Sequence, residues 1–132
     1  MRIRPAVTGE GWALDVGERR VGYIRGSAVG FVGFASDEEA ALAARMAYRV
    51  LTRRRSDATR PASEEEPRFG LLPPDSPDTR GSWGFEITLR PEESVDVFAM
   101  ARARIMWNAI RASGLATAMR QFAPAPSASA AG

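Results

Sequence analysis

Residues 36–55 read SDEEAALAARMAYRVLTRRR and carry the clearest structural signal in the chain. Ser36 followed three residues later by Glu39 forms the S-x-x-E capping box that begins a helix. Acidic residues fill the first turn and three arginines end the stretch, so each charge lies at the end of the helix dipole that favours it. The stretch therefore predicts one long α-helix.

Small side chains dominate the predicted buried side of this helix. At ~100° per residue, one wide arc carries Ala40, Ala43, Ala44, Met46, Ala47, Val50 and Leu51. Arg45, Arg49 and Arg53 lie on the opposite side. Alanines let a partner surface approach closely, so we expect this helix to lie flat against a sheet.

Composition excludes several kinds of chemistry. The chain has 132 residues, which suits a single domain, and it contains neither Cys nor His, while all 18 of its basic residues are Arg. These absences exclude disulfides, zinc fingers, Ser-His-Asp triads and Schiff-base lysines. The sequence thus indicates no cofactor, no metal site and no catalytic residue.

Charge and hydropathy bear on location and partners. No window approaches the ~18 consecutive apolar residues of a membrane span, and the start, MRIRPAVTGEGW, has no apolar signal-peptide core. We therefore expect a cytoplasmic protein with no membrane partner. The net charge is only +2. The use of Arg at every basic position is explained either by compositional bias or by phosphate contacts.

Residues 2–34 predict an antiparallel β-meander. Their apolar and polar residues alternate as in half-buried strands. Gly17-Glu18 and Gly26-Ser27 each fit a two-residue hairpin turn with Gly first. The first turn places Val16 opposite Arg19, Asp15 opposite Arg20 and Leu14 opposite Val21. Residues 2–7 predict an additional edge strand, because Pro5 is tolerated at the edge of a sheet and not in its middle.

The predicted turns assign the strand residues to two sheet faces. The core face in this register carries Trp12, Leu14, Val16, Val21, Tyr23, Val32 and Phe34. The other face carries Ala13, Ile24, Val29 and Phe31. A sheet with helices on one side is expected to be polar on the other, so this apolar second face indicates a surface for self-association or for a partner. A shift of one residue would exchange the faces, and that alternative remains open.

Residues 56–82 show no hydrophobic period. Five prolines and the run Glu64-Glu65-Glu66 fall here, and a structureless connection of this length is unusual inside a compact domain. We interpret the stretch as a mobile linker within one domain of residues 1–122, except that Phe69, Leu71 and Leu72 could attach its middle to the body of the protein. Residues 123–132 are rich in Ala, Pro and Ser and predict a disordered tail.

A second strand and a second helix follow this stretch. Residues 83–90 alternate as a strand, and Pro91 and Gly114 mark the start and the end of a helix. Arg102 falls near the centre of the helix's apolar stripe, where a guanidinium needs an acidic or carbonyl partner or a bound anion. Met100 and Trp107 lie off the stripe and predict a contact with the core, the linker or another molecule.

Together these elements predict an α+β fold. It consists of an antiparallel β-meander of three to five strands with two α-helices packed on one face, in the order β-β-β-(β)-α-β-α. Helices on one side of a single sheet bury only that face, so what covers the other face remains open.

Three classes of function remain open. The first is a small non-enzymatic protein-association module, expected to be a homodimer, whose candidate interface residues are Ile24, Val29, Phe31, Met100 and Trp107. The second is nucleic-acid binding, with candidate anion or phosphate contacts at Arg45, Arg49, Arg53, Arg54, Arg55 and Arg102. The third is a carboxylate-dependent enzyme, for which the strand-borne candidates are Asp15 and Glu86.

Overall fold

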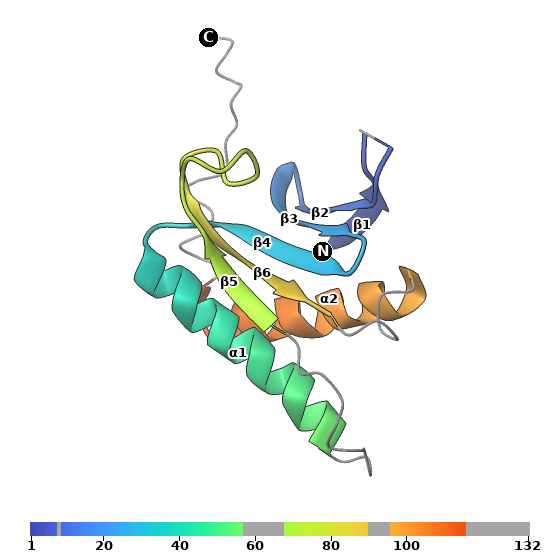
Figure 1. Cartoon of the computed structure of the whole chain (residues 1–132). Helices are drawn as coiled ribbons and strands as arrows, with labels where there is room; N and C mark the ends of the chain where they lie inside the picture. Colours follow the sequence, from blue (N-terminus) through green and yellow to red (C-terminus); the bar gives the residue numbers. More distant parts are fainter. Residues whose placement is uncertain (8, 57–67, 90–95, 116–132) are drawn as a thin grey trace, which may run out of the picture.

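The structure, a computed structural model, describes residues 1–7, 9–56, 68–89 and 96–115. Its elements in chain order are β1 (Arg2–Pro5), β2 (Trp12–Val16), β3 (Arg19–Arg25), β4 (Ala28–Phe34), α1 (Asp37–Ser56), β5 (Arg68–Leu72), β6 (Trp83–Thr88) and α2 (Asp96–Ala112). The strands form one antiparallel sheet in the order β1-β2-β3-β4-β6-β5. Both helices pack on the same side of it (Figure 1). The predicted α+β fold is therefore confirmed, with six strands.

Helix α1 begins as its sequence predicts. The Ser36 hydroxyl accepts a hydrogen bond from the backbone N–H of Glu39 at 3.2 Å, and the Glu39 carboxylate accepts one from the N–H of Ala35 at 3.3 Å. The alanines of the predicted inner arc are completely buried, namely Ala40, Ala43, Ala44 and Ala47. Their small size lets α1 approach the sheet closely, as expected.

A bulge in β3 decides which strand residues face the helices. The turns pair Val16 with Arg19 and Asp15 with Arg20, as predicted. One residue further the register shifts, so Leu14 lies opposite Gly22 instead of Val21. Because side chains alternate along a strand, this shift exchanges the faces of the remainder of β3.

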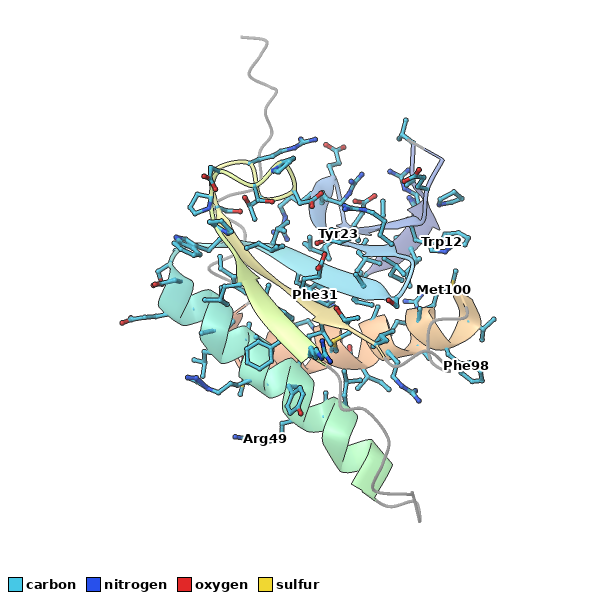
Figure 2. All side chains as sticks on the ribbon, in the orientation of Figure 1. Trp12, Tyr23, Phe31, Arg49, Phe98 and Met100 are labelled. Atoms are coloured by element: carbon cyan, nitrogen blue, oxygen red, sulfur yellow. The ribbon has the colours of Figure 1, made fainter. Side chains whose placement is uncertain are left out.

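The sheet faces predicted for β3 and β4 were therefore wrong. Ile24, Val29 and Phe31, predicted to face outward, lie under the helices. Tyr23 and Val32, predicted to face inward, border a cavity on the helix-free face instead. Figure 2 shows Tyr23 and Phe31 on opposite sides of the sheet. The alternative left open above, a register shift of one residue that exchanges the sheet faces, is correct for β3 and β4. Strand β2 keeps its predicted face.

A second bulge, at Gly33, returns the end of β4 to the core. The register shifts between Val32 and Phe34, and Gly33 has a φ of 103°, a conformation that favours glycine. The extra residue places the Phe34 ring on the helix side, 6.0 Å from the ring of Phe85. Phe34 thus occupies the core, as predicted, although its neighbour Val32 does not.

Aromatic rings form the centre of the core. Phe31 lies between Phe85, at 5.7 Å between ring centroids, and Trp107 of α2, which stacks on it at 6.1 Å. Trp107 is only 6 % exposed, so of the roles left open for it the structure shows a core contact. Met100 is partly buried and packs against the same core. Phe98, also on α2, is exposed.

Strand β5 corrects the interpretation of residues 56–82 as a structureless linker. Residues Arg68–Leu72 pair with β6 along their whole length. The following segment, residues 73–82, contains several backbone hydrogen bonds and ends in the buried side chain of Ser82. The remainder of the predicted linker, and the predicted tail at 123–132, lie outside the described residues.

Candidate functional site

Three of the five predicted interface residues have no free surface. Ile24, Val29 and Phe31 are between 0 and 2 % exposed because the bulge in β3 turns them toward the helices. The apolar outer face predicted from the register is therefore part of the core. A surface for association has to lie elsewhere on the molecule.

The two edges of the sheet differ in their chemistry. At one edge, β1 carries two exposed arginines and ends in Pro5, which has no N–H to offer a further strand. At the other edge, β5 reads RFGLL, with one charge and no proline. Phe69 and Leu71 of β5 are 43 % and 39 % exposed. Within the described residues, β5 pairs with β6 alone, so its outer edge is open.

Phe69 connects this edge to helix α1. Its ring meets the ring of Tyr48 edge-on, with 5.8 Å between centroids. Leu71 lies on the same side of the sheet as Phe69, since alternate strand residues share a face. The open edge of β5 with Phe69, Leu71 and Tyr48 is called the β5 edge surface below. This surface was not predicted from the sequence, although the two apolar residues that flank Gly70 are a short strand signal inside the proline-rich stretch.

The helix-free face of the sheet holds a buried ion pair network at Asp15. The carboxylate is held by Arg20 at 2.7 Å, the cross-strand partner expected from the first turn, and by Arg4 of β1 at 2.9 Å. Asp15 is 6 % exposed, so its charge is satisfied by these two guanidinium groups. The network ties strands β1, β2 and β3 together.

A second polar cluster on this face is centred on Tyr23. Its hydroxyl donates a 2.5 Å hydrogen bond to Glu86, and the Arg25 guanidinium lies 4.1 Å above its ring and pairs with Asp78 at 2.7 Å. A Cβ at Gly30 would lie 2.4 Å from the ring, so the glycine makes room for it. Burial, and then the Glu86 hydrogen bond, raise the pKa of Tyr23 well above its usual 10.0, which keeps the phenol a proton donor.

The two candidate catalytic carboxylates do not come together. Asp15 and Glu86 share the helix-free face, as expected, but β2 and β6 are three strand spacings apart, roughly 14 Å. Two-carboxylate hydrolytic sites place the groups about 5–9.5 Å apart. Each carboxylate is also held by its own partner, so the geometry gives the carboxylate-enzyme alternative no support.

The predicted arginine contacts lie on both helices. Arg45 and Arg49 are exposed on α1, and Figure 2 shows Arg49 pointing away from the body of the protein. Arg102 is partly buried on α2. The side chains of Arg53, Arg54 and Arg55 lie outside the described part of the chain. A role of these arginines in nucleic-acid binding stays a prediction.

The described residues contain neither a candidate metal site nor a candidate membrane-spanning helix. Among the described residues, no three acidic side chains gather as a metal site would require, and no helix there is long and apolar enough to cross a membrane. Neither family models, nor curated proteins, nor solved structures gave a match to this chain. Any proposal for the function of this protein therefore has to be based on the geometry of the chain itself.

Proposed function

We propose that this chain is a non-enzymatic protein-association module that forms a homodimer through the β5 edge surface. The observation that carries the proposal is the contrast between the two sheet edges. Natural proteins block open edges with proline and charge, as β1 does, because an open edge recruits another strand. Strand β5 has an open edge and two exposed apolar side chains beside it.

A second copy of the chain fits this edge because the strand is complementary to itself. If two β5 strands pair antiparallel about a two-fold axis at Gly70, Phe69 of each copy lies opposite Leu71 of the other. Both apolar pairs then lie on the helix side of a continuous sheet. The two Arg68 side chains lie at opposite ends of the pairing, about 13 Å apart along the strand, so like charges do not meet. A symmetric dimer needs this kind of self-complementary patch.

The size of the surface sets the expected strength. Each cross-strand apolar pair contributes roughly 0.2–1 kcal/mol, in addition to the backbone hydrogen bonds of the new ladder. One strand pair with its flanking helix residues buries less than the ~1,200 Å² of a standard stable interface. We therefore expect a reversible dimer with a dissociation constant of about micromolar order.

The test is the oligomeric state of the full chain, measured by sedimentation velocity over a wide range of concentration around this value. Leu71→Lys places a charge opposite Phe69 of the other copy and is expected to leave a monomer. Leu71 is already exposed, so the monomer fold is expected to survive, which far-UV circular dichroism checks. Leu42→Lys is the matched control, because Leu42 is similarly exposed, at 44 %, but lies on α1 and outside the β5 edge surface.

The proposal fails if the wild-type chain sediments as a monomer at every concentration. It also fails if Leu71→Lys dimerises as well as the wild type. Loss of the dimer in Leu42→Lys but not in Leu71→Lys would move the interface to α1.

A further inference from the structure

The helix-free face contains a cavity of about 120 Å³. Strands β3 and β4 form its floor, and residues 77–82, in the segment that joins β5 to β6, form its wall. In Figure 1 this segment curls over the side of the sheet opposite the helices. Sites for drug-sized ligands are ~300–1,000 Å³, so this cavity suits a small polyatomic group.

The wall of the cavity is built and anchored by hydrogen bonds. The Thr79 hydroxyl, 3 % exposed, donates to the carbonyl oxygens of Pro73 and Ser76. The Ser82 hydroxyl donates to the carbonyl of Thr79 at 2.7 Å and accepts from the N–H of Gly33 in β4 at 3.0 Å. The segment is thereby attached to the sheet at the Gly33 bulge, and the cavity keeps its shape without a ligand.

The lining of the cavity is strongly basic. Among the described lining residues are Arg19, Arg20, Arg25 and Arg80, against the single carboxylate of Asp78. Arg25 is bound to Asp78, and Arg20 to Asp15 outside the cavity. No ion pair holds the Arg19 or Arg80 guanidinium in the described part of the chain. Among the described residues, Arg80 is therefore the lining arginine on this side of the sheet without a counter-ion, because Arg19 is the cross-strand partner of Val16 and shares its helix-side face.

The backbone at Arg80 adds an independent observation. Arg80 has a φ of 51°, in the left-handed region, and within the described residues it is the one non-glycine residue with a positive φ. Glycine follows it directly, with a φ of 93°. A long side chain at such a position is disfavoured relative to glycine, and strained residues of this kind gather at binding sites. The conformation places an arginine at the cavity at the expense of the chain's stability.

We propose that this cavity, here called the arginine pocket, binds a small oxyanionic group, a phosphate or a carboxylate, at the Arg80 guanidinium. The planar guanidinium donates paired hydrogen bonds to such groups. The pairing of Arg25 with Asp78 and its stacking over Tyr23 position a second guanidinium at the floor without leaving it free. Tyr23 is neutral and already donates to Glu86, so it adds no negative charge that would repel the anion.

The probes are inorganic phosphate and succinate, titrated separately into the full chain at constant ionic strength and followed by isothermal titration calorimetry. Arg80→Gln and Arg80→Gly each remove the free guanidinium and are expected to weaken binding about tenfold or more. Arg80→Gly also removes the strained side chain, so its thermal midpoint is expected to rise while affinity falls. Arg111→Gln, at an exposed position near the end of α2, removes the same charge away from the pocket and is expected to bind as the wild type does.

Binding of either anion that is weakened in both Arg80 variants but not in Arg111→Gln supports the proposal, and the preferred probe identifies the head group. Binding of neither anion overturns it, as does binding that all three variants weaken equally, because net charge alone would then explain it. The result does not depend on dimerisation, since the pocket lies on the helix-free face at β3, β4 and residues 77–82, while the proposed dimer uses the outer edge of residues 68–72 and apolar side chains on the helix side.

Discussion

Gly30 and Tyr23 face each other on neighbouring strands and show how much one side chain determines on the helix-free face. Because Gly30 has no Cβ, the Tyr23 ring can lie across it and reach Glu86 on the next strand. The same ring supports Arg25, which in turn holds Asp78 of the wall of the arginine pocket. One missing side chain therefore permits a chain of contacts that crosses three strands.

Gly30→Ala is predicted to destabilise the fold by about 1–3 kcal/mol, because the new Cβ would overlap the Tyr23 ring and displace it from Glu86. The measurement is the free energy of unfolding in urea. Gly70→Ala is the matched control, since Gly70 lies in the same row of the sheet but has open space at its Cβ position. It is expected to be neutral or stabilising by up to about 1 kcal/mol. Equal losses in the two variants would show that the close contact at Gly30 is unimportant.

At the scale of elements, helix α1 depends on alanine for its position. Completely buried alanines line its inner side, and larger residues lie at the margins. The Phe69 ring of β5 reaches Tyr48 at one of these margins. The closeness of helix and sheet therefore determines how the β5 edge surface is built.

Ala44→Leu is predicted to cost about 1–3 kcal/mol, because three extra carbon atoms have to be accommodated where Ala44 is completely buried. Ala41→Leu makes the same chemical change on the same helix at a partly exposed position, and its effect is expected to stay within about 0.5 kcal/mol. Urea unfolding of both variants measures the difference. A loss at Ala41 as large as at Ala44 would contradict the close packing described for α1.

For the whole molecule, the two proposed sites lie on different strands. Strand β3 of the arginine pocket and strand β5 are three strand spacings apart, roughly 14 Å, and the wall of the pocket begins at residue 77, beyond the end of β5 at Leu72. Among the described side chains, no ion pair joins the two sites. Residues this far apart without shared partners act additively in most proteins. Dimer formation and anion binding are therefore expected to be separate properties of one fold.

This independence can be measured. Leu71→Lys is predicted to abolish the dimer and to change the affinity for phosphate by less than about twofold, while Arg80→Gln is predicted to weaken phosphate binding and leave the dimer's dissociation constant unchanged. Isothermal titration calorimetry measures the affinity of each variant for phosphate, and sedimentation velocity measures the dissociation constant of its dimer. A change of about tenfold or more in the property that should not respond would mean that the sheet couples the two sites.

The sequence by itself determined the features that depend on residues close together in the chain. The capping box of α1, the two hairpin turns and the helix end at Gly114, with its φ of 90°, were all readable, because each rests on contacts within a few positions. The α+β class followed from the order of these elements. The basic character of the arginine pocket was not readable, because its arginines come from β3 and from residue 80, which are brought together only by folding.

Only the tertiary structure decided the faces of the sheet, the place of β5 and the pocket. One extra residue in β3 and another at Gly33 reversed the inward and outward sides, and no local pattern marks such a bulge, since its position depends on the strand paired beside it. Strand β5 was hidden among prolines because it becomes a strand by pairing with β6. Pairing between distant segments thus determined which side chains remain at the surface to bind anything.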